Sequence, residues 1–242
     1  MKGVFVTATD TGAGKTVVSC ALISALRRTG LRVVGMKPVA SGCEQTANGL
    51  ISDDARQLAD ASGLGLPMDL VNSYRFLPAI APHVAAAEAG TRIELPRIEA
   101  VFLQLCAFAD VVVVEGIGGL RVPLNDREEV ADLVQMLGLP VVLVVGMRLG
   151  CLNHALLTAE AVERREIPVC GWVANHIDPD MAHQEENVIA LGDRLGWPSV
   201  GRIPFLTDTS VDHVAKHLDR DQILRALDDA ERARPLGPES HA

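Results

Sequence analysis

A glycine turn followed by a lysine and a threonine lies near the start of the chain, in "TDTGAGKT" at residues 9–16. The common phosphate-loop pattern, G-x-x-x-x-G-K-[ST], begins with glycine, whereas this chain has Thr9 at that place. An apolar stretch precedes the turn and a segment of helical period follows it, so backbone N–H groups can surround an anion there. Lys15 can reach nucleotide phosphates and the Thr16 hydroxyl can ligate Mg²⁺. The stretch therefore predicts a nucleotide site rather than an ordinary strand-to-helix turn.

An acid stands at the end of a second apolar stretch, in "VVVVEGIGGL" at residues 111–120. Ligands of parallel α/β sheets gather at the carboxyl ends of the strands. We therefore expect Glu115 to point toward the phosphate loop, as a direct or outer ligand of Mg²⁺. Without the loop, the same pattern would be an ordinary strand end.

Three further charged residues have simpler explanations. Lys37 ends a short apolar segment before Pro38, and a lysine at a strand end is usually solvated. Ser52 is a suitable N-cap, and acids in the first helical turn after it complement the helix dipole. From these residues alone, a solvated role is favoured for Lys37, Asp53 and Asp54.

Two other positions leave alternatives open. A helix that begins near Gly150 could bind a carboxylate at its N-terminus, although every helix has such an end. Asn175 could read a purine edge through its amide, or it could simply be a turn residue. His83, His154 and His176 lack metal-ligand spacing, so we expect them to be structural or solvated.

Apolar, valine-rich segments alternate with helical ones and so predict an α/β fold with a mostly parallel sheet. Apolar residues on both faces of "VVVVEG" and "VVLVVG" indicate central strands with helices on both sides of the sheet. Strands are expected at 3–8, 32–37, 111–115, 140–146, 168–174 and 198–203. Helices are expected at 15–29, 53–62, 96–109, 129–138, 151–165, 182–195 and 218–231.

Two segments interrupt this alternation. Residues 63–95 contain three prolines and are expected to form a loop or cap near a site. The polar, proline-containing end predicts a disordered tail at 232–242, which leaves 1–231 as a single domain.

The overall composition excludes several classes of partner. Lysine and arginine number 22 against 31 acids, a net charge of −9, and no basic cluster favours nucleic acid or an anionic membrane. Apolar runs such as the one from Pro140 are shorter than a membrane span needs. Five scattered cysteines without a C-x-x-C pair indicate reduced, mostly buried thiols and a cytoplasmic protein.

Taken in order, seven segments resemble the dethiobiotin synthetase family: "TDTGAGKT", "KPVASG", "SDDA", "PHVAAAEAG", "VEGIGGL", "LGCLNHALLT" and "GWVAN". Members of that family have a P-loop NTPase-type fold and work as homodimers, with the active site near the subunit interface. The resemblance implies an ATP- and Mg²⁺-dependent ligase of biotin biosynthesis, whose substrates are 7,8-diaminononanoate (7,8-diaminopelargonate) and CO₂ or bicarbonate. Family members also begin the phosphate loop with Thr-Asp-Thr, so Thr9 is a family variant.

The resemblance also implies roles for individual residues. Nucleotide binding falls to Asp10, Thr11, Gly12, Ala13, Gly14, Lys15, Thr16, Asn175, Pro204, Phe205 and Leu206. Thr16, Asp54 and Glu115 would surround Mg²⁺, while Lys15 and Lys37 would stabilise the transferring phosphoryl group. Substrate would contact Thr11, Lys37, Ser41 and Gly118, with its carboxylate captured by Gly150, Cys151, Leu152 and Asn153 of the other subunit. No acid after Leu206 clearly matches the residue that contacts the ribose in some family members. Some members also place a tyrosine near the substrate, beyond "GWVAN", but the only tyrosine of this chain is Tyr74.

The implied reaction has three steps: an amine adds CO₂ to form a carbamate, ATP phosphorylates it, and the second amine closes the ring.

The main rival is a partitioning or division-site ATPase, which carries a lysine five positions before the loop lysine. Asp10 stands at that place and argues against such a switch. An amidoligase of cobalamin synthesis would need a glutaminase part, for which 242 residues leave little room. A nucleotide-binding module without catalysis is the simplest alternative.

Overall fold

Six parallel strands form the central sheet of the computed structural model, which describes residues 2–233. The strand order is β10-β9-β8-β1-β7-β2, so β1 lies between β8 and β7. This confirms the expected fold class and all six predicted strands, with ends that differ by up to two residues. The strands are β1 (Lys2–Ala8), β2 (Val33–Met36), β7 (Val111–Glu115), β8 (Val141–Met147), β9 (Val169–His176) and β10 (Ser199–Ile203).

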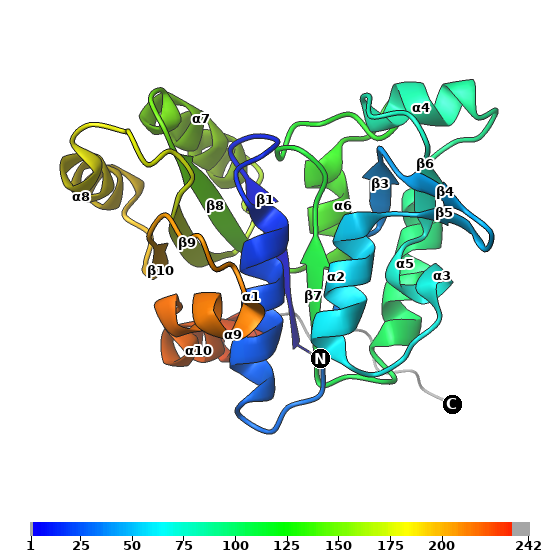
Figure 1. The fold of residues 1–242 in the computed structure, drawn as a ribbon, viewed down its shortest axis with the longest axis horizontal. Helices are drawn as coiled ribbons and strands as arrows, with labels where there is room; N and C mark the ends of the chain where they lie inside the picture. Colours follow the sequence, from blue (N-terminus) through cyan, green and yellow to red (C-terminus); the bar gives the residue numbers. More distant parts are fainter. Residues whose placement is uncertain (1, 234–242) are drawn as a thin grey trace.

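Helices cover both faces of this sheet (Figure 1). One face carries α1 (Lys15–Arg27), α2 (Asp53–Ser62), α9 (Val211–Val214) and α10 (Arg220–Ala233). The other carries α5 (Leu95–Leu105), α6 (Val130–Leu137), α7 (Cys151–Arg164) and α8 (Gln184–Leu195). Every residue of β7 and of β8 is buried, as the absence of polar alternation in their sequences predicts.

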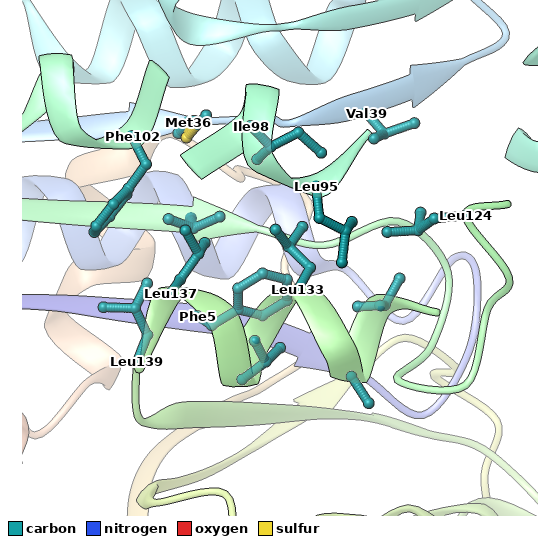
Figure 2. Packing of buried hydrophobic residues seen from close by; sticks show 14 of the residues in the cluster. Phe5, Met36, Val39, Leu95, Ile98, Phe102, Leu124, Leu133, Leu137 and Leu139 are labelled. Atoms are coloured by element: carbon teal, nitrogen blue, oxygen red, sulfur yellow. The ribbon is translucent and has the colours of Figure 1, made fainter. Parts of the chain in front are cut away.

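Helices α5 and α6 hold the sheet from one side through a cluster of large apolar side chains (Figure 2). Phe5 of β1 lies next to Leu133 of α6, and Ile98 and Phe102 of α5 belong to the same cluster. This packing fixes the positions of β1 and β7. The phosphate loop follows the carboxyl end of β1, and Glu115 is the last residue of β7.

Residues 63–95 lie near a cavity, as expected, but they contain regular elements rather than a plain loop. They contain α3 (Met68–Val71), β6 (Tyr74–Phe76) and α4 (Pro82–Glu88). The strand β6 pairs in parallel with β3 (Val39–Ser41), directly after Lys37 and Pro38. The prolines limit the length of the helices here without preventing them, since Pro82 stands in the first turn of α4.

A small hairpin, the short helix α9 and the turn after it were not predicted from the sequence. The hairpin joins β4 (Glu44–Thr46) to β5 (Gly49–Ile51) through a turn of two residues, Ala47 and Asn48, and Asn48 followed by Gly49 is a common turn signal in sequence. A 3₁₀ turn, η1 (Ala215–His217), follows α9. Elements of three or four residues are too short to show a period, which explains why the pattern did not reveal them.

Helix α10 ends at Ala233, so two residues of the expected tail continue this helix. The rest of that tail, 234–242, lies outside the described residues. No helix within residues 2–233 is both long and apolar enough to cross a membrane. The five cysteines are free, and four of them are buried, as expected.

Candidate active site

The phosphate loop turns at two glycines with left-handed backbone angles. Gly12 has φ +78° and Gly14 has φ +89°, and α1 begins at Lys15 without a side-chain cap. Thr9 directly follows β1, and its N–H still donates to the Val144 carbonyl of β8 at 3.1 Å. The turn therefore needs no glycine at the first position of the common pattern, and the uncapped N–H groups of α1 face a potential anion.

Asn175, near the end of β9, supports the phosphate loop through a hydrogen bond. Its Nδ2 donates to the Ala13 carbonyl at 2.9 Å, and a Cβ at position 14 would lie 2.1 Å from the same nitrogen. Gly14 is therefore required for space as well as for its backbone angle. Asn175 lies within β9, so the turn-residue alternative is wrong; the side chain is buried and supports the phosphate loop.

Lys15 folds back over the loop that it follows. Its Nζ lies 3.3 Å from the carbonyl oxygen of Asp10, and its side chain is buried. Burial, together with the positive charge of Lys37, lowers the pKa of Lys15 to about 8. A phosphate group placed against the loop would favour the charged form of this lysine.

Two carboxylates and a hydroxyl converge beside the loop. The Thr16 hydroxyl donates to Asp54 at 2.9 Å and approaches Glu115 at 3.0 Å. Glu115 is buried, and its second oxygen, Oε2, has no hydrogen-bond partner. An orphaned carboxylate oxygen beside a second carboxylate and a hydroxyl offers the oxygen ligands that Mg²⁺ prefers. No cluster of three or more His, Cys, Asp and Glu suited to a metal occurs among residues 2–233.

Lys37 lies against the same carboxylates, which overturns the solvated role that its sequence context favoured. Its Nζ is 2.5 Å from Glu115 Oε1 and 2.7 Å from Asp54 Oδ2. Burial alone would lower the pKa of Lys37, but the charges of Glu115 and Asp54 outweigh burial and hold it above its ordinary value. Asp54 is likewise not a plain dipole residue: burial would raise its pKa, but Lys37 holds it below the usual range.

Asp53 does fit the simple explanation. Its side chain is exposed and pairs with Arg56 one turn later on α2. Ser52 is the N-cap of this helix and accepts the Ala55 N–H at 3.4 Å. The two neighbouring acids thus differ in function because only Asp54 faces the carboxyl edge of the sheet.

A cavity of about 780 Å³ joins the loop to these groups. It is lined by ten of the residues proposed from the sequence: Thr11, Gly12, Gly14, Lys15, Thr16, Lys37, Ser41, Asp54, Glu115 and Gly118. The remaining walls were not named as individual residues beforehand and are mostly apolar, although four of them lie in the stretch 63–95 that was expected near a site: Val17, Ala40, Ala79, Ile80, Ala81, Pro82, Ile117, Val122 and Pro123. The quoted segment "PHVAAAEAG" and the prolines of 63–95 were the signals that could have pointed to part of this wall.

Other candidate residues lie outside this cavity. Asn175 pairs in register with Ile203, so Pro204, Phe205 and Leu206 begin beside it at the same edge of the sheet. Gly150 is the N-cap of α7, with φ +96° and open space around it, and Cys151 behind it is buried. The range 150–153 does not line the cavity of its own chain.

An ion pair that the sequence did not indicate connects the loop to the turn before α7. The Arg148 guanidinium donates to Asp10 Oδ2 at 2.6 Å, and Asp10 Oδ1 accepts the Thr11 N–H at 2.7 Å. Asp10, which stands where the rival ATPases have a lysine, is thus held by the loop and by the segment after β8.

The remaining polar candidates do not line the cavity. Tyr74 accepts the Glu94 N–H and stacks under Arg97, so it supports β6. His154 is exposed, and His176 is buried, which together with the charge of Arg202 lowers its pKa. Asp208 and Asp212 make contacts with Ser210 and Arg28 rather than with the cavity.

Most of the chain is similar to proteins of one known family. A family model described as an AAA domain matches residues 2–212. The ATP-dependent dethiobiotin synthetase BioD of Nitrosospira multiformis is 56% identical over 84% of this chain and 88% of its own length. The protein of the same name from Pseudomonas aeruginosa strain UCBPP-PA14 is 50% identical over 90% of this chain and 96% of its own.

Solved structures of low sequence similarity share the fold. A ParA family ATPase from Chlorobium tepidum superimposes with a TM-score of 0.54 at 16% identity, covering 96% of this chain and 99% of that one. The septum site-determining protein MinD of Pyrococcus horikoshii, complexed with Mg-ADP, gives 0.54 at 14% identity, covering 96% of each chain. Identities this low relate the fold alone, whereas the curated relatives are about half identical over most of the chain. This chain therefore belongs to the ATP-dependent dethiobiotin synthetases, within the AAA-domain family whose model it matches.

Proposed function

We propose that this protein forms the ureido ring of dethiobiotin from 7,8-diaminononanoate and CO₂, converting ATP to ADP and phosphate. The observation that carries the proposal is the cavity of about 780 Å³, which joins the phosphate loop and two buried lysines to an apolar wall. A cavity with that composition fits an aliphatic diamine beside a nucleotide.

The nucleotide phosphates lie over the turn from Asp10 to Thr16 in this proposal. The left-handed glycines and the uncapped start of α1 direct N–H groups at them. Lys15 exchanges its contact with the Asp10 carbonyl for the β- and γ-phosphates. Adenine lies near Asn175, between it and the segment Pro204 to Leu206.

Thr16, Asp54 and Glu115 would hold Mg²⁺. The residues fit the ion, because Glu115 Oε2 lacks a partner and both other groups lie within hydrogen-bond distance of one another. Bound there, Mg²⁺ would neutralise charge on the phosphate oxygens during transfer.

The diamine lies in the rest of the cavity, with Thr11, Ser41 and Gly118 beside its amines and Lys37 beside the carbamate. Ile80, Pro82 and their apolar neighbours contact the carbon chain. Holding diamine and ATP together contributes on the order of 7–11 kcal/mol to lowering the barrier, through orientation alone.

The reaction follows from this placement. One amine attacks CO₂ and loses a proton to give a carbamate, whose oxygen attacks the γ-phosphorus and expels ADP. The second amine attacks the carbamoyl carbon of this mixed anhydride, phosphate leaves, and the ring closes. Lys15 and Lys37 stabilise the charge on the transferring phosphoryl group, and their charge favours the neutral, nucleophilic form of the amines.

For the assembly, we propose a homodimer in which Gly150 to Asn153 bind the substrate carboxylate of the partner's site. The open N-terminus of α7 supports this, as does Leu149, which is 95% exposed next to it. Residues 1–231 act as one domain in the cytoplasm, where free cysteines such as Cys20 stay reduced.

The decisive experiment mixes the protein with diaminononanoate, bicarbonate, Mg²⁺ and ATP, and follows ADP and ring product. Diamine-dependent ADP release in step with product is expected, and its absence would contradict the proposal. Lys37→Gln should reduce turnover severely, while the exposed Lys216→Gln serves as the matched control.

For the assembly, Leu149→Asp should give monomers by light scattering, and Leu103→Asp, on the exposed surface of α5, should not.

A further inference from the structure

Lys37 already forms ion pairs with both carboxylates that were assigned above to Mg²⁺. Its ammonium lies between them, 2.5 Å from Glu115 Oε1 and 2.7 Å from Asp54 Oδ2, and 3.2 Å from the Gly116 carbonyl. The lysine side chain is 4% exposed, so water does not screen this cation.

The free oxygens of the carboxylates are few. Glu115 Oε1 accepts from Lys37 and lies against Thr16, and both oxygens of Asp54 are engaged, Oδ1 by Thr16 and Oδ2 by Lys37. Only Glu115 Oε2 lacks a partner. A cation bound by Glu115 Oε2 and Asp54 Oδ1 would lie close to the Lys37 ammonium that the same carboxylates hold, and the positive charges would repel at such short range.

Hydrogen bonds fix the backbone of Lys37, so only its side chain can move when a cation binds. Its N–H donates to the Val71 carbonyl at 2.7 Å, and its carbonyl accepts from Asn72 Nδ2 at 2.6 Å. Asn72 is fully buried, and Pro38 follows directly. The ammonium, in contrast, borders the cavity, with Ser41 on the same wall.

We propose that Lys37 is the resident counter-cation of Asp54 and Glu115, and that it leaves them for the phosphate side of the cavity only when a divalent cation binds. This rests on the metal ligands of the proposed function. Lys37 would then be withheld from the phosphates until the metal arrives, which couples metal loading to the availability of the lysine charge.

Metal binding without nucleotide or diamine tests this competition. Mn²⁺ affinity, measured by calorimetry or by electron paramagnetic resonance, should rise about tenfold or more in Lys37→Gln because the competing ammonium is gone. Lys15→Gln removes an equal charge that does not contact either carboxylate, so its effect should be clearly smaller. An unchanged or weaker affinity in Lys37→Gln, or an equal gain in both variants, would overturn the inference.

A second measurement uses the unaltered protein and does not depend on the stability of a variant. Crystal structures with and without Mn²⁺ and ADP should show Lys37 Nζ leaving hydrogen-bond distance of both carboxylates when the ion is present. A lysine that keeps both contacts beside the bound ion would contradict the proposal, as would the absence of any Mn²⁺ binding. Ring formation is judged separately by diamine-dependent ADP release, so the two failures are distinguishable.

Discussion

Arg148 and Asp10 join two functional segments that are far apart in sequence. The guanidinium lies 2.6 Å from the carboxylate, and the side chains are 43% and 47% exposed. Because Asp10 also accepts the Thr11 N–H, the pair restrains the first turn of the phosphate loop from the side of α7.

Replacing Arg148 by glutamine should therefore weaken ATP binding while leaving the fold intact. A partly exposed ion pair contributes about 0.2–1 kcal/mol, which predicts a loss of affinity of up to about fivefold. Calorimetric titration with ATP measures it, and Arg127→Gln, an exposed arginine near the chain's Asp126, is the control. Equal affinities for the Arg148 variant and the unaltered protein would show that the pair does not restrain the loop.

Gly14→Ala should be far more harmful than the same change at Gly30. Both glycines have φ +89°, so the backbone strain is equal, about 1 kcal/mol. Only at position 14 does the new Cβ meet Asn175, at 2.1 Å. Urea unfolding and ATP binding report the difference, and the double variant Gly14→Ala with Asn175→Ala should recover part of the loss. If the two single variants behaved alike, the clash would be unimportant.

Asp54 and Asp53 provide a matched pair of neighbouring acids. Asp54→Asn should reduce turnover by about a hundredfold or more, since it removes a proposed metal ligand and a partner of buried Lys37. Asp53→Asn should stay within about twofold, since it removes only an exposed contact and a dipole interaction. Steady-state rates at saturating Mg²⁺ and ATP decide this, and similar losses in both would contradict the separate roles.

ATP affinity should fall as the pH rises above about 8. The pKa of Lys15 is lowered to about 8 by burial and by Lys37, so the free protein loses this proton in that range. Phosphates favour the charged lysine, so binding takes up a proton and affinity falls by at most about tenfold per pH unit. Dissociation constants at several pH values test this. Lys15→Arg, which stays charged, should give a flatter profile, and an identical slope would contradict the assignment.

The sheet and its main helices were predictable because their apolar runs are long enough to show a period, as in β7 and β8. The shorter elements were not, although Asn48 and Gly49 carried a recognisable turn signal. Among the charged residues, Glu115 was placed correctly toward the loop because a parallel strand determines where its end lies.

Lys37 and Asp54 could not be placed from local sequence. Their burial arises from packing between segments that local patterns treat separately, and a strand end or a first helical turn looks the same whether it faces solvent or a cavity. Only the family resemblance singled them out. For the same reason the stretch 63–95 could be expected near a site, but the individual wall residues from Ala79 to Pro82 could not be picked out.

The bond from the Thr9 N–H to β8 also has a consequence for recognising such proteins. It ties the first position of the phosphate-loop pattern, which directly follows β1, to the edge of the sheet, where a β-branched residue is favourable and glycine is not needed. A search that demands glycine there rejects this chain. One that demands glycines only where the backbone is left-handed, at positions 12 and 14, accepts it.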